Sequence, residues 1–148
     1  MDANIFGPEG VGVDANGDVY FTDNGSFVVR KISGGIINTV VGVGSFRGDG
    51  GPATEAVLSY TRGVMIGNSG EIYIADGYIN GRVRKVGANG IISTVAGNGR
   101  MGWNEGDGGP ATEAGIYYPW DVTQDGAGNL YIGDYITCTV RKGAPEGI

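Results

Sequence analysis

Residues 48–56 read Gly-Asp-Gly-Gly-Pro-Ala-Thr-Glu-Ala, and the same nine letters return at residues 106–114. Nine consecutive identities at a separation of 58 residues indicate an internal repeat. A tyrosine-containing segment that ends in aspartate also recurs. It occurs three times, at residues 19–23, 72–76 and 130–134. The chain is therefore built from copies of one unit, each more than 30 residues long.

Two further segments complete the unit. Val-Arg-Lys stands at residues 29–31, 83–85 and 140–142, and Gly-Ile-Ile-x-Thr-Val stands at residues 35–40 and 90–95. Divided after the glutamate of each nonapeptide, the repeats are 3–55, 56–113 and 114–148. The third repeat lacks the last segment and the nonapeptide, so the chain holds about 2.65 repeats.

Each repeat reads as four short strands. The segments are rich in β-branched and aromatic residues, and Asn, Asp and Gly separate the first segment from the second, as at Asp14–Asp18. Four antiparallel strands that recur every 50 to 60 residues are typical of propeller blades. We predict an all-β fold of four-stranded antiparallel blades, which as a single chain is an incomplete propeller.

The composition limits the function classes. The chain has 148 residues, 31 glycines and a formal charge of −6, which disfavours nucleic-acid binding. It contains no histidine, so it lacks the commonest general base and zinc ligand. Cys138 is the only cysteine, and the sequence contains neither an apolar run long enough for a membrane span nor a signal-peptide pattern.

The order Pro-x-Gly-Val-x-Val-Asp, Asn-Gly-Asp-Val-Tyr-Phe-Thr-Asp, Val-Arg-Lys-Ile, Thr-Val-Val-Gly and Gly-Asp-Gly-Gly-Pro-Ala-Thr resembles the NHL repeat, in its bacterial type with a long glycine-rich blade connection. The resemblance covers residues 3–148 and implies a propeller. The resemblance also implies binding of other molecules rather than any one catalytic reaction. The lyases of this family depend on histidines, and this chain has none to carry over. An extracellular or cell-surface location is implied by the resemblance alone.

The repeated aspartates are candidate ligand-binding residues. Asp23, Asp76 and Asp134 each follow the second strand, and an arginine lies across a short loop in the third strand. They could form a polar ring that binds a ligand around the central channel. Alternatively, each aspartate makes a salt bridge or caps a loop within its blade, and recurrence in every blade favours this second interpretation.

A second group of candidates breaks the repeat. Residues 100–105 contain three more residues than the corresponding segment around Phe46, and they place an aromatic side chain on a connecting loop. Exposed aromatic residues on loops are typical anchors for a protein or glycan ligand. The candidates from this loop pair are Arg100, Met101, Trp103, Asn104 and Phe46.

We therefore predict a non-catalytic binding or assembly module, with no cofactor and no metal, that recognises a protein or glycan. Fewer than three complete blades leave strand edges unpaired, so the propeller is completed either by a homo-oligomer, such as a dimer of about six blades, or by a longer chain. The rival hypothesis is a carboxylate- and calcium-dependent lyase or hydrolase that uses Asp23, Asp76 or Asp134 in the channel of the completed ring.

Overall fold

The computed structural model describes residues 3–44, 48–103 and 105–144 of the chain. The first blade is a four-stranded antiparallel sheet in the order β1-β2-β3-β4. Its strands are β1 (Pro8–Val13), β2 (Val19–Asp23), β3 (Val28–Ser33) and β4 (Ile36–Val41). Asp14 closes the first hairpin, because its carboxylate accepts hydrogen bonds from the amides of Asn16 and Asp18 and Gly17 takes a positive φ of 84°.

The second and third blades repeat this plan. The second contains β5 (Thr61–Ile66), β6 (Ile72–Asp76), β7 (Arg82–Val86) and β8 (Ile92–Ala96), again in sequential order. The third contains β9 (Pro119–Gln124), β10 (Leu130–Asp134) and β11 (Thr139–Gly143). The predicted all-β fold, an incomplete propeller of antiparallel blades, is confirmed, while the exact limits of the repeats stay a prediction.

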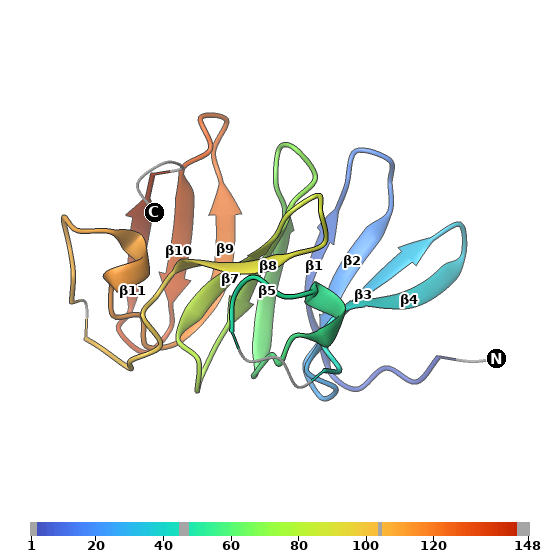
Figure 1. The fold of residues 1–148 in the computed structure, drawn as a ribbon, viewed down its shortest axis with the longest axis horizontal. Coiled ribbons are helices and arrows are strands. Elements are labelled where there is room, and N and C mark those ends of the chain that lie inside the picture. Colours follow the sequence, from blue (N-terminus) through green and yellow to red (C-terminus); the bar gives the residue numbers. More distant parts are fainter. Residues whose placement is uncertain (1–2, 45–47, 104, 145–148) are drawn as a thin grey trace.

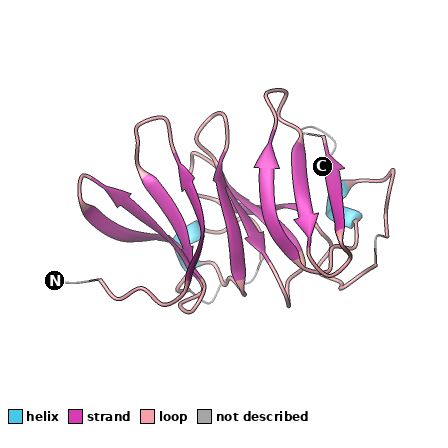
Figure 2. Cartoon of the chain, turned by 180° about the vertical axis from the view of Figure 1, so that it is seen from behind, coloured by secondary structure: helices cyan, strands magenta, loops and turns pink. Residues whose placement is uncertain are grey.

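The three blades stand side by side (Figure 1). Their first strands lie next to one another, and β5 packs against both β1 and β9. Seen from behind, the hairpins that join first and second strands all point to the same end of the molecule (Figure 2). The opposite end carries the loops between second and third strands and the connections between blades; we call it the loop end.

Two apolar clusters hold the blades together. One joins blades one and two around Val29, Val41, Leu58, Ile74 and Ile92, and the other joins blades two and three. We call the first strands of the three blades, β1, β5 and β9, the inner strands. Their close approach depends on glycine, because a Cβ at Gly10 would lie 2.4 Å from the carbonyl oxygen of Arg62. The hydroxyl of Thr22 donates a hydrogen bond to the same carbonyl oxygen across 2.6 Å.

The two nonapeptides are connections that cross from one blade to the next. Each contains one 3₁₀ turn, η1 (Ala53–Glu55) or η2 (Ala111–Glu113), just after its proline. The first nonapeptide continues along the outer strand of blade two, where Pro52 bridges Ile91 and Gly50 donates to the carbonyl oxygen of Ile92. These turns are the helices of the described residues, and neither is long and apolar enough to cross a membrane.

Candidate binding site

The three repeated aspartates are buried at the loop end and hold loops in place. The Asp23 carboxylate accepts the amide of Phe6, and the Asp76 carboxylate accepts the amide of Ser59, at 2.8 and 2.7 Å. Asp134 accepts the amides of Tyr117 and Tyr118 and those of the following loop. All three are at most 3% exposed. The described chain thus gives their carboxylates backbone partners rather than solvent.

Asp76 also has side-chain partners. Its Oδ2 accepts a hydrogen bond from the Asn80 amide at 2.8 Å and lies 3.7 Å from Nη1 of Arg84. Burial raises the pKa of Asp76 to about 6, against the hydrogen bonds from Ser59 and Asn80 and the positive charges of Arg84 and Arg82, which lower it. The raised pKa means that the loop contacts do not fully replace the lost hydration of the carboxylate.

The candidates on the connection between blades two and three are exposed. Trp103 is 68% exposed and its ring meets that of Tyr117 edge to face, with 5.9 Å between centroids. Met101 is 52% exposed, and the amide of Arg100 donates to the side chain of Asn98. Phe46 and Asn104 lie outside the described residues. The placement of Trp103 leaves most of its ring open to a partner.

A larger aromatic surface lies beside the inner strands. Six rings form an unbroken series of contacts across the three blades, with centroid separations of 4.8 to 6.2 Å and mostly edge-to-face geometry. We call this series the aromatic row; its members are Phe27, Tyr60, Tyr78, Tyr118, Trp120 and Tyr135. Five of the six are 40% to 60% exposed, and Tyr118 is buried.

The row is built by alternation. Phe27, Tyr78 and Tyr135 come from the loops between second and third strands of blades one, two and three. Tyr60 and Tyr118 precede β5 and β9, so each stands at a junction between two blades. Loop and junction rings therefore interleave, and the row exists only because the blades are packed together.

One arginine lies at the centre of this surface. Glu9, Arg62 and Trp120 occupy the same position in the first strands of the three blades. The Arg62 guanidinium pairs with Glu9 on one side and stacks 4.4 Å from the centroid of the Trp120 ring on the other. Its Nε also donates to the hydroxyl of Tyr118 at 2.7 Å. These contacts fix the guanidinium over the inner strands.

A hollow of about 450 Å³ opens at this arginine. Its walls come from all three inner strands, with Glu9 and Val11 of β1, Arg62 of β5, and Trp120 and Asp121 of β9. Val11 is 66% exposed there. Trp120 belongs both to the hollow and to the aromatic row, so the charged groups of the hollow adjoin the exposed rings.

Sequence reasoning missed most of this surface, although a signal was present. The repeat keeps Gly and Val after the position of Glu9, Arg62 and Trp120 in two of its three copies, yet this position changes completely from blade to blade. A position that varies inside a repeated strand is not needed to maintain the blade, and this variation is the signal in the sequence that could have found it.

Comparison with known proteins agrees with the geometry. The model of the teneurin NHL domain family matches residues 45–105. The chicken NHL repeat-containing protein 2 is 36% identical over 119 residues, which cover 78% of this chain and 16% of that protein. Human teneurin-4 is 34% identical over 99 residues, which cover 56% of this chain and 4% of that protein. The chain belongs to the NHL-repeat β-propeller family.

Solved structures share the fold of this chain. A Bacteroides thetaiotaomicron protein of unknown function superposes with a TM-score of 0.79 at 25% identity, over 97% of this chain and 37% of that one. Streptogramin B lyase superposes with a TM-score of 0.67 at 15% identity, over 100% of this chain and 41% of that one. This NHL chain thus spans less than half of either structure, and a small part of the two relatives above.

Proposed function

We propose that this chain is a binding module, non-catalytic in itself, whose aromatic row and Arg62 recognise a protein or glycan at the loop end. The single observation that carries the proposal is the exposure of five linked aromatic rings around a fixed guanidinium. Tyrosine, tryptophan and arginine are the residues that dominate the binding energy of protein interfaces. The composition of the surface therefore favours a protein partner over a glycan.

The fixed positions of Arg62 and of the exposed rings support recognition as well. Arg62 is held on two sides before any ligand arrives, so little side-chain entropy remains to be lost when a partner binds. The exposed rings are likewise held by their neighbours in the row. A surface that is both apolar and rigid gives affinity at low conformational cost.

The exposed loop around Trp103 is a second surface for the same function. Trp103 and Met101 offer an apolar tip, and Arg100 adds a charge beside it. Ring contacts in the described residues join Trp103 to Tyr117 and not to the aromatic row. The two surfaces can therefore be separated by substitution.

A lyase or hydrolase is the competing function. This hypothesis is supported by one relative, the probable peptidyl-alpha-hydroxyglycine alpha-amidating lyase of Caenorhabditis elegans. That protein is 35% identical over 57% of this chain and 24% of its own length. The hypothesis needs Asp23, Asp76 or Asp134 to bind calcium. In the described structure, these carboxylates already accept two or more hydrogen bonds each, which weighs against it. Calorimetric titration with calcium tests the point directly.

The proposed binding site can be tested with ligands selected on the chain itself. A phage-displayed peptide library and a glycan array are screened with the purified chain, and the affinity of each selected ligand is measured by fluorescence titration. We expect Trp120→Ala and Arg62→Ala to weaken binding about ten-fold or more, because hot-spot truncations commonly cost at least that much. Ile36→Ala is the matched control, since Ile36 is a 64% exposed apolar residue at the other end of blade one.

The outcome also ranks the surfaces. Loss of binding in Trp103→Ala, with Trp120→Ala unchanged, would move the site to the connection between blades two and three. Ligands that bind all four variants equally would contradict the proposed function.

A further inference from the structure

Asp76 joins two segments that carry rings of the aromatic row. Its Oδ1 accepts the amide of Ser59, the residue before Tyr60, at 2.7 Å. Its Oδ2 accepts a hydrogen bond from the side chain of Asn80 at 2.8 Å, and Asn80 lies in the loop that carries Tyr78. The rings of Tyr60 and Tyr78 meet edge to face, with 5.6 Å between their centroids. One buried carboxylate therefore holds both sides of a contact in the middle of the row.

The loop of blade two is held less firmly than the loop of blade three. Asp134 of blade three accepts hydrogen bonds from the backbone amides of Tyr117, Tyr118, Ile136 and Thr137. Asp76 accepts one backbone amide, that of Ser59, and reaches its loop through the side chain of Asn80. The position of Tyr78 thus depends on a hydrogen bond between two side chains.

A buried hydroxyl lies opposite this carboxylate. Thr61 faces Asp76 across the β5–β6 ladder, and both residues are 0% exposed. Residues directly opposite each other in an antiparallel pair have Cβ atoms about 5 Å apart. Within the described chain, Oγ1 of Thr61 has no hydrogen-bond partner, which is unusual for a buried polar atom. The residues opposite the aspartates of the other two blades are Pro8 and Pro119, so blade two differs by carrying a hydroxyl here.

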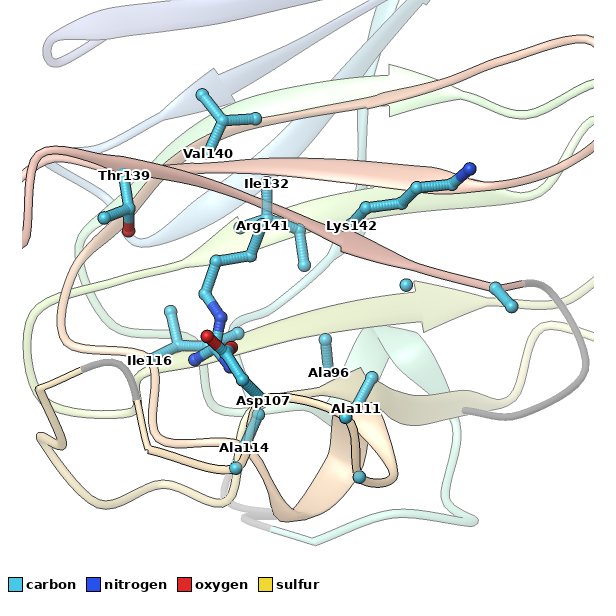
Figure 3. A pocket seen from close by; sticks show the side chains of 15 residues that line it. Ala96, Asp107, Ala111, Ala114, Ile116, Ile132, Thr139, Val140, Arg141 and Lys142 are labelled. Carbon is cyan, nitrogen blue, oxygen red and sulfur yellow. The ribbon is translucent and has the colours of Figure 1, made fainter.

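The nearest arginine does not depend on Asp76 for its counter-charge. Nη2 of Arg84 lies 2.8 Å from the Asp49 carboxylate, whereas Nη1 lies 3.7 Å from that of Asp76. In blade three, the guanidinium of Arg141 likewise points to Asp107 on the connection (Figure 3). Loss of the charge on Asp76 therefore leaves Arg84 with its closer partner.

Burial and charge act on Asp76 in opposite directions. The charged groups that face it are Arg84 and Arg82 of β7, with Asp49 beyond Arg84. The neutral groups that face it come from the connection, the loop and β5, and they are Ser59, Asn80 and Thr61. Burial raises the pKa of Asp76 to about 6, against the hydrogen bonds and the arginines, which lower it. Both forms of the carboxyl are therefore populated between about pH 5 and pH 7.

We propose that Asp76 and Thr61 form a proton switch that controls the aromatic row, a regulatory role that rests on the proposed function. The ionised carboxylate accepts at both oxygens and holds the segments of Tyr60 and Tyr78 together. When a proton from solvent binds, one oxygen becomes a donor and no longer pairs with the Asn80 amide. Its hydrogen is accepted by Oγ1 of Thr61, across the ladder. The loop that carries Tyr78 is then released, and the row loses its central contact.

The chain stays folded when the switch operates. Protonation removes a buried charge, so it stabilises the fold while it removes a loop contact. With a midpoint near 6, about a tenth of the molecules keep the ionised form at pH 5. Because that form presents the complete row, the affinity for a ligand of the row falls about ten-fold between pH 7.5 and pH 5.

A titration without any ligand tests the switch. The full chain is followed by NMR between pH 4.5 and pH 7.5, at the amide of Ser59 and at the rings of Tyr60 and Tyr78. We expect the three signals to titrate together with a midpoint near 6, and Asp76→Asn to abolish the titration. Thr61→Val should lower the midpoint by about half a unit or more, because the protonated form loses its acceptor. Thr61→Ser is the matched control, which keeps the hydroxyl and should keep the midpoint.

Peptide binding tests the consequence for recognition. The probe is a peptide that is selected on the chain at pH 7.5, is weakened by Trp120→Ala, and contains no His, Asp or Glu that would titrate itself. We expect the natural chain to bind it about ten-fold more weakly at pH 5 than at pH 7.5. Asp76→Asn should bind it equally weakly at both, and Thr61→Val should keep more of its affinity at pH 5 than Thr61→Ser.

The possible failures are distinguishable. Rings that do not titrate with the Ser59 amide, or a midpoint that is unchanged or higher in Thr61→Val, would overturn the switch. Equal affinity of the natural chain at the two pH values would show that Asp76 does not regulate the row. A selection that yields no peptide dependent on Trp120 would contradict the proposed function, while the ring titration, which needs no ligand, still decides the switch.

Discussion

The carboxylate of Asp49 lies 2.8 Å from the guanidinium of Arg84, although the two residues belong to different blades. Asp49 comes from the connection after blade one, whereas Arg84 is a 3% exposed residue of β7 that also faces Asp76. The connection therefore brings a counter-charge to a buried arginine of the next blade. Nonapeptide and arginine recur together in the repeat because they form this contact between neighbouring blades.

The second copy of the contact joins the same two residue types but is more exposed to solvent. Asp107 pairs with Arg141, but the Asp107 side chain is 78% exposed, compared with 49% for Asp49. We expect Asp49→Ala to lower the free energy of unfolding by about 1 to 2 kcal/mol, because it leaves a buried guanidinium short of one partner. Asp107→Ala should cost less than about 1 kcal/mol, as exposed ion pairs usually do.

Urea unfolding of the two variants measures this difference. Because the surrounding nonapeptides are identical in sequence, each variant is the control for the other. Equal losses of stability would show that burial of the arginine does not set the strength of the contact.

Glycine at the inner strands gives a second prediction. A Cβ at Gly63 would lie 2.2 Å from Oδ1 of Asp121 and 2.8 Å from its Cα, so Gly63→Ala must push β5 and β9 apart. We expect a loss of about 1 to 3 kcal/mol from this overpacking. Gly133→Ala in β10 is the control, because a Cβ there meets nothing within 4 Å. Thermal melts of the two variants check the prediction, and similar Tm values for both would contradict it.

The blades were predictable because their signals are local. Each Tyr-x-x-Asp segment and each Asn/Asp/Gly turn specifies a strand or hairpin without reference to the rest of the chain, as Asp14 and Gly17 illustrate. The contact made by the nonapeptide was not predictable, since Asp49 pairs with an arginine 35 residues further along the chain, in another blade. The aromatic row was missed for the same reason. Its rings come from loops and junctions of unequal spacing, which only the packing of blades aligns.

The buried Asp76 predicts an unusual dependence of stability on pH. Its pKa in the folded chain is raised to about 6 by burial, from an ordinary value of 3.8. The protonated form therefore favours folding, so this contribution is fully present below pH 4 and is lost as the pH rises through 6. A shift of about two units corresponds to about 3 kcal/mol at most.

Comparison with a variant isolates this one group from the other carboxylates. Urea unfolding of the natural chain and of Asp76→Asn is measured at several values between pH 4 and pH 7. We expect the stability of the natural chain relative to Asp76→Asn to fall as the pH rises. A difference that stays constant, or that grows with pH, would show that Asp76 is not held with a raised pKa.

Tyr60 is held in a conformation that a tyrosine seldom adopts. Its φ is 44°, and the residue at the same place in blade one is Gly7, with a φ of 81°. A left-handed backbone costs a non-glycine residue about 1 kcal/mol or more. The side chain at this position therefore lowers the backbone's own stability, while its ring joins Phe27 to Tyr78 in the aromatic row.

Two substitutions separate the backbone from the ring. Tyr60→Ala and Tyr60→Gly both remove the ring contacts, but only glycine relieves the left-handed backbone, so we expect Tyr60→Gly to be more stable than Tyr60→Ala by about 1 kcal/mol. At Tyr78, whose φ is not positive, alanine should be at least as stable as glycine. Chemical unfolding of the four variants checks the reversal. If both Tyr60 variants unfold at the same urea concentration, the backbone relaxes when the ring is lost, and the aromatic row itself holds Tyr60 in the left-handed conformation.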